Sequence, residues 1–291
     1  MEGPISTTSL LKGSNNNELW QAIQAGRIEA ALQLLGGAPA DKTRRWFSFG
    51  KKEPPAPVVG PVQQLARDLL SGKITDLVAP TTTLTKAGDL FPEWVRFLWV
   101  LQDNGHYHAP MTSGLQATIP WLEQLAAEVS EKADGYPQKS IAAYIWRNGA
   151  ILRKWCDPVA GLFQQQGKPQ DRAKILQLKC QLTGAIMSHY PQTLGPDMIA
   201  AAAAWESVGE TAIPQRYYQA IITDFQPLAE DIRAMAAEGV TEDGIQILQA
   251  LRDAYDGWNR IQQAPAFAVE RAWVETLLQK GVTASVEDED D

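Results

Sequence analysis

One segment combines positive charge with aromatic rings more densely than the rest of the chain. Residues 42–52 contain five cations and three aromatic side chains. This combination suits an acidic groove on a protein, an anionic membrane surface or single-stranded nucleic acid. The surrounding charge is balanced, so the pattern favours a protein partner or an internal anchor over a membrane or nucleic acid. The candidate binding residues are Arg44, Arg45, Trp46, Phe47 and Phe49.

Two histidines form the second chemical feature. His106 and His108 stand two residues apart in a predicted loop, a spacing at which both rings could reach one metal ion. No HExxH motif or pair of CxxC motifs accompanies them. We therefore expect a loop or helix-capping role and no metal. A metal-dependent enzyme that uses these two histidines is the alternative.

The remaining reactive residue types have structural interpretations. Cys156 and Cys180 lie among apolar residues, as small buried hydrophobes do, and two cysteines are too few for a disulfide framework. Neither glycine-rich phosphate-binding motif occurs. Two acidic pairs, at 230–231 and 242–243, are expected at helix starts, where the helix dipole favours negative charge. We therefore predict no catalytic residue and no cofactor.

Composition narrows the possible functions further. The 291 residues include 26 basic and 34 acidic residues, and five of the acids are the last five residues. Without that acidic tail the charge is nearly balanced, so the chain lacks the broad positive field of nonspecific nucleic-acid binding. No apolar run approaches the roughly 18 residues of a membrane span. Few cysteines and no secretory leader pattern predict a cytoplasmic protein.

Apolar residues recur every three or four positions along most of the chain, a spacing typical of amphipathic helices. The clearest helix is predicted over residues 241–263, with Thr241 as its N-cap. We predict roughly twelve helices in an all-α fold, either a multi-helix bundle or an irregular α-solenoid of helix pairs. Prolines are expected to mark helix starts, namely Pro61, Pro92, Pro120, Pro137, Pro169, Pro196, Pro214, Pro227 and Pro265.

Five segments follow from these patterns. We predict a flexible N-terminus (1–16), a helical hairpin module (17–37), a basic, aromatic and proline-rich linker (38–61), an all-helical body (62–281) and an acidic tail (282–291). The hairpin resembles an ankyrin-type helix pair in its order of apolar and turn residues, and this resemblance implies a hairpin but no partner. Its matching residues are Leu19, Ala22, Gly26, Ile28, Glu29, Ala31, Leu34, Leu35 and Ala38.

The ten tryptophans are predicted to divide between the hydrophobic core and the protein surface. Trp121, Trp155 and Trp258 lie on apolar stripes and are predicted in the core, as is Tyr144. Trp94 and Trp99 are five residues apart on one helix, so one of them should pack outside the main core. Together these features predict a protein–protein interaction module, such as an adaptor, an assembly factor or a chaperone-like scaffold.

Overall fold

The computed structural model describes Gln21, Ala30 and residues 60–80, 82–102, 107–137, 141–236 and 239–280. Nine α-helices and no strand occur in residues 60–280 of this description, which confirms the all-α prediction. The helices are α4 (Pro61–Leu70), α5 (Leu84–Gln102), α6 (His108–Asp134), α7 (Ala143–Gln165), α8 (Pro169–Met187), α9 (Pro191–Glu206), α10 (Ala212–Met235), α11 (Glu242–Gln262) and α12 (Ala268–Lys280).

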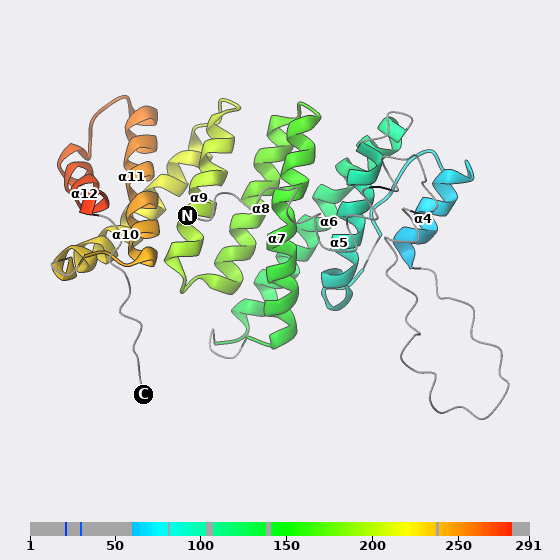
Figure 1. The fold of residues 1–291 in the computed structure, drawn as a ribbon, viewed down its shortest axis with the longest axis horizontal. Coiled ribbons are helices and arrows are strands. Elements are labelled where there is room, and N and C mark those ends of the chain that lie inside the picture. The colour runs from blue at the N-terminus through cyan, green and yellow to red at the C-terminus, as the bar shows by residue number, and fades with distance from the viewer. Residues whose placement is uncertain are drawn as a thin grey trace.

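The helices from α5 onward form an elongated row in which consecutive helices run antiparallel (Figure 1). Short turns join α7 to α8, α8 to α9 and α9 to α10, so each helix is followed at once by an antiparallel neighbour. Alternate helices are therefore parallel, and α5, α7, α9 and α11 share one direction. This arrangement agrees with the predicted bundle or solenoid of helix pairs.

One continuous hydrophobic core runs along the row. Leu248 is fully buried, so the stripe of the 241–263 prediction faces the core. The Thr241 hydroxyl accepts a hydrogen bond from the Gly244 amide at 3.1 Å, which confirms the predicted N-cap of α11. Ala30, from the predicted hairpin module, also packs against this core.

The tryptophan predictions divide by position. Trp121 and Trp155 are buried as expected, whereas Trp258 is only half-buried. Trp94 is fully buried and donates a hydrogen bond to the Thr118 hydroxyl at 2.9 Å, while Trp99 is half-buried at the edge of the core. The two indoles of α5 therefore occupy different environments, as their spacing predicted.

The proline rule for helix starts is only partly correct. Pro61 and Pro169 stand in the first turn of α4 and α8. Four others lie inside helices instead, so the predictions there are wrong: Pro92 in α5, Pro120 in α6, Pro196 in α9 and Pro227 in α10. In α5, Phe91, Trp94 and Val95 are all fully buried around the proline. Their burial outweighs the roughly 3 kcal/mol that an internal proline costs a helix.

None of the nine described helices combines the length and the apolar character that a membrane crossing requires. The predicted linker residues 38–59, the acidic tail 282–291 and most of the hairpin module lie outside the described residues.

Candidate functional site

The end of α6, the start of α7 and the start of α9 lie at the lower side of Figure 1, and four exposed aromatic residues belong to these segments. Tyr136 follows the end of α6, Tyr144 and Trp146 lie in the first turn of α7, and Tyr190 immediately precedes α9. The chain reverses direction at each of these places, so the tips of neighbouring helices meet at this edge. We call these four residues the aromatic edge.

Contacts inside the row show that the start of α7 lies beside the ends of α6 and α8. A Cβ atom on Gly149, in the second turn of α7, would lie 3.1 Å from Ile186 near the end of α8. It would also lie 3.4 Å from Val129 near the end of α6. The start of α7 therefore sits beside the ends of α6 and α8, so the segments that carry Tyr136, Tyr144 and Trp146 lie at the same end of these helices.

The exposure of these residues contrasts with that of the other aromatic residues that the structure describes. The aromatic edge leaves between 43% and 53% of each residue open to solvent. Tyr144 was predicted in the core, and this prediction is wrong because only the neighbouring Ile145 points inward. Seven large apolar side chains are strongly exposed within the described residues, and the four of the aromatic edge are among them. Clustered exposed apolar groups commonly mark interaction surfaces.

Charged side chains lie near these aromatic residues, and they form ion pairs with one another. Lys132 lies over the Tyr144 ring, 6.0 Å from its centroid, and forms an ion pair with Glu128. Arg147 and Asp89 approach to 3.9 Å across α7 and α5, with both side chains highly exposed. The edge therefore offers aromatic faces bordered by both signs of charge, with no excess of cations.

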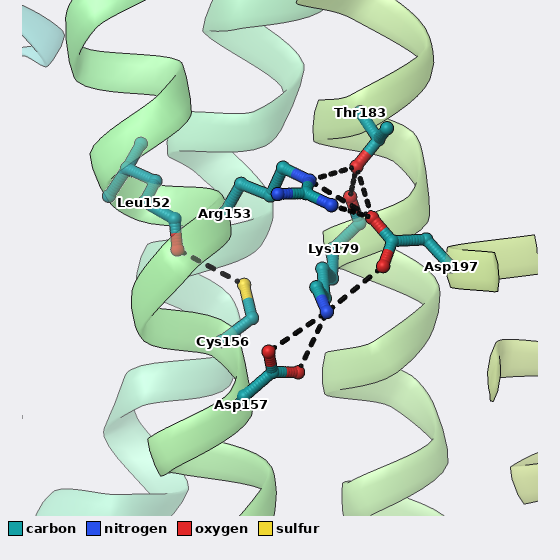
Figure 2. Close-up of polar contacts among 7 residues, drawn as sticks. All are labelled: Leu152, Arg153, Cys156, Asp157, Lys179, Thr183 and Asp197. Atoms are coloured by element: carbon teal, nitrogen blue, oxygen red, sulfur yellow. Dashed lines mark hydrogen bonds and ion pairs between the residues drawn. The ribbon is translucent and has the colours of Figure 1, made fainter. Parts of the chain in front are cut away.

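A second polar feature lies deeper, where α7, α8 and α9 meet (Figure 2). The Asp197 carboxylate of α9 is 5% exposed and receives three partners. The Arg153 guanidinium of α7 lies 2.8 Å away, the Lys179 ammonium of α8 lies 2.9 Å away, and the Thr183 hydroxyl of α8 donates at 2.7 Å. Lys179 also donates to both carboxylate oxygens of Asp157 at 2.9 Å. We call these five residues the Asp197 network.

The network is electrostatically balanced. Two cations face two carboxylates, and Asp157 is half exposed while Asp197 is buried. Burial by itself would lower the pKa of Lys179, but the charges and hydrogen bonds of Asp197 and Asp157 outweigh this, and the net shift is upward. Every charge in the network therefore has a partner, which is the arrangement that makes a buried ionic group tolerable.

Both cysteines are buried, as their apolar neighbours predicted. Burial raises the pKa of Cys180 to about 12, and it raises the pKa of Cys156 further still. The Cys156 thiol donates to the Leu152 carbonyl at 3.3 Å. A thiol held protonated in this way lacks the thiolate that a nucleophile or metal ligand needs.

The other predicted site residues fall in three places. Arg44, Arg45, Trp46, Phe47, Phe49 and His106 lie outside the described residues. His108 is the exposed first residue of α6. Of the acidic pairs, Glu242 and Asp243 occupy the first turn of α11 as predicted, whereas Glu230 and Asp231 lie near the end of α10, where the dipole argument does not apply.

No group of three or more His, Cys, Asp or Glu side chains within the described ranges could hold a metal ion. The metal alternative at His106 and His108 stays a prediction.

Sequence reasoning missed the aromatic edge and the Asp197 network. Trp146 follows Ile145 on α7 and is turned about 100° away from it around the helix, which was a readable sign of exposure. Asp197 stands alone among the apolar residues of α9, and an isolated acid on such a face needs buried partners. The identity of those partners could not be read, because Arg153 and Asp197 are far apart in the chain.

Comparisons with known proteins returned no match: no family model fits this chain, and neither a curated protein nor a solved structure is significantly similar to it.

Proposed function

We infer that the chain is a protein-binding helical scaffold that uses the aromatic edge to contact its partner. The observation that supports this proposal is that Tyr136, Tyr144, Trp146 and Tyr190 are all exposed and stand where α6 ends and where α7 and α9 begin. Tyrosine and tryptophan are enriched among the residues that dominate protein interfaces, because each buries a large area at a small entropic cost. An adaptor, an assembly factor and a chaperone-like scaffold would all use such a surface.

The opposite edge of the row provides a comparison surface. There, α7 ends and α8 begins with exposed glutamines, namely Gln164, Gln165 and Gln170. Gln166, the C-cap of α7, donates a hydrogen bond at 2.7 Å to Gln102, the last residue of α5. Polar side chains of this kind are ordinary solvated surface, and their replacement should leave partner binding unchanged.

The test compares two variants of the full chain as bait. Trp146→Ala/Tyr190→Ala removes two rings of the aromatic edge, and Gln164→Ala/Gln170→Ala is the matched control at the opposite edge. Partners captured by the parent chain are quantified by mass spectrometry. We expect the first variant to lose a partner that the control retains, because a lost hot-spot aromatic costs about 2 kcal/mol or more in binding. Equal capture by both variants, with equal melting temperatures, would refute the proposal for this edge.

The basic and aromatic segment 42–52 remains a second candidate binding element. Trp46→Ala/Phe47→Ala belongs in the same experiment, because its loss of a partner would locate the interface there instead. The two locations are separable, since each double variant changes only one of them.

A further inference from the structure

The helix row is not uniformly packed. In the first half, α5 packs along α7 and α6 along α8, and in the second half α9 packs along α11. The corresponding pairs across the middle, α7 with α9 and α8 with α10, lack this extensive packing. The two halves, α5–α8 and α9–α12, are therefore held together mainly by the antiparallel contact of α8 with α9. We call this contact the joint.

Close interlocking of side chains occurs inside each half. In the first half, Ile186 packs against Gly149 and Asn148 packs against Gly88. Both contacts are so close that a Cβ atom on either glycine would crowd its neighbour. In the second half, Gly195 of α9 admits the Phe225 ring of α10. Such knob-in-hole contacts fix the relative positions of helices, because a shift in any direction produces a clash.

The glycine of α8 nearest to the Asp197 network has open space beside it. Gly184 of α8, one residue from the Asp197 network, has no atom within 4 Å of where its Cβ would lie. On α9, Ala201, Ala204 and Trp205 follow Asp197 at four-, seven- and eight-residue spacing, so two buried methyl groups and one indole share its side of the helix.

Polar side chains instead bridge the joint. Arg153, Lys179 and Thr183 all reach Asp197 across it. Gln177 of α8 accepts a hydrogen bond from the Trp205 indole of α9 at 3.1 Å. Hydrogen bonds and ion pairs are directional, so they can fix a register that a smooth apolar contact leaves open.

We propose that the α8–α9 contact is a conformational joint and that the Asp197 network is the latch that sets the angle between the two halves. Tyr136, Tyr144 and Trp146 belong to the first half, and Tyr190 to the second. The latch therefore also sets the separation of the rings in the aromatic edge. The latter consequence rests on the proposed function, whereas the latch itself does not.

The test measures the geometry directly, without a partner. Spin labels are placed on cysteines introduced at exposed positions, Gln164→Cys in α7 and Gln249→Cys in α11, and their distance distribution is recorded by pulsed electron resonance. Cys156 and Cys180 are buried and do not compete for the label. A second label pair, at Gln124→Cys and Gln164→Cys, lies entirely within the first half and reports on general loosening.

The decisive variant is Arg153→Met/Lys179→Met/Asp197→Leu, which replaces the latch with apolar residues of similar size. Substitutions of this kind often leave stability unchanged while the packing loses uniqueness. We expect the cross-joint distribution to shift or to broaden by about twofold or more, while the pair within the first half stays unchanged. Asp197→Asn, which keeps the side-chain shape and removes the charge, should change the cross-joint distribution in the same direction.

The matched control removes an ion pair within the first half. Lys174 of α8 lies 2.9 Å from Glu123 of α6, and Lys174→Met/Glu123→Leu should leave the cross-joint distribution unaltered. The proposal is overturned if the latch variants keep the parent's cross-joint distribution, or if both label pairs broaden together. Because no partner is present, a failure of the proposed binding function would not affect either result.

Discussion

Helix α9 carries two carboxylates that face opposite halves of the molecule. Asp197 turns towards α7 and α8, where it meets Arg153, Lys179 and Thr183. Glu206 turns towards α10 and α11, where Arg260 binds it through two nitrogens at 3.0 and 3.1 Å and Tyr218 donates at 2.9 Å. Each acid thus combines a guanidinium with a hydroxyl.

The two clusters differ mainly in burial. Asp197 is 5% exposed, whereas Glu206 is 27% exposed and its partner Arg260 is more than half exposed. Water can replace the lost partner of an exposed charge but not that of a buried one. We therefore expect loss of the carboxylate to reduce the free energy of unfolding much more at Asp197 than at Glu206.

The largest effect should come from Asp197→Ala. This change leaves Arg153 and Lys179 facing each other without their shared carboxylate, and removal of one partner from a buried ion pair costs about 3–5 kcal/mol. Chemical denaturation should report the loss as a lower midpoint. A loss below 1 kcal/mol would mean that water reaches the network and that the two carboxylates are equivalent.

A steric change in the second half should have the next largest effect. Gly257 of α11 lies against the Tyr218 ring, and a Cβ atom there would overlap three ring atoms. Tyr218 is 1% exposed and held by Glu206, so it has little room to move. We expect Gly257→Ala to cost about 1–3 kcal/mol.

The matched control for that substitution is Gly184→Ala in α8. No atom lies within 4 Å of its Cβ position, so the better helix propensity of alanine should stabilise the chain by about 0.5–1 kcal/mol. Opposite signs for the two glycine variants in the same denaturation assay would confirm that the Gly257 position is filled by the Tyr218 ring and that the Gly184 position is open. A destabilised Gly184→Ala variant would contradict the open position.

The two clusters should also respond to opposite ends of the pH scale. Hydrogen bonding to Arg260 lowers the pKa of Glu206 from its ordinary value of 4.5. Its contribution is therefore complete above pH 4.5 and is lost as the pH falls through the folded value. The pKa of Lys179 is raised above 10.5, so its contribution is complete below that pH and is lost as the pH rises through the folded value.

Single variants separate these two windows. Glu206→Gln should lower stability at neutral pH by about 1 kcal/mol and flatten the decline on the acid side. Lys179→Met should leave the acid side as it is and flatten the decline on the alkaline side. Melting temperatures recorded from acid to alkaline pH for both variants check the assignment, which fails if the two changes appear on the same side.

The smallest effect on stability is expected at the aromatic edge. Trp146→Ala/Tyr190→Ala should lower the free energy of unfolding by about 1 kcal/mol or less, because 46% of Trp146 and 53% of Tyr190 are already open to solvent. Trp155→Ala, at a buried indole of the same α7, should cost about 3–5 kcal/mol. A melting temperature that falls equally in both would show that the exposed rings support the fold.

Local patterns in the sequence were sufficient to predict the helices but less reliable for their boundaries. The 241–263 helix was predicted with its Thr241 cap, because an N-cap and an apolar stripe are encoded by neighbouring residues. The starts at Pro92, Pro120, Pro196 and Pro227 were wrong, because burial on both sides of each proline depends on helices elsewhere in the chain. A rule based on neighbouring residues cannot compare the free energy gained from that burial with the cost of the backbone hydrogen bond that proline cannot donate.

By itself, the sequence determined that the chain is helical, which stripes are apolar and which cysteines are buried, since all of these follow from spacings within one helix. Only the tertiary structure decided that Asp197 meets Arg153 and Lys179, and that the segments carrying Tyr136, Tyr144, Trp146 and Tyr190 lie at one side of the row. The physical reason is that both groups are assembled from separate helices. Their contacts depend on how α6, α7, α8 and α9 pack against one another, and the spacing within one helix carries no record of the register between helices.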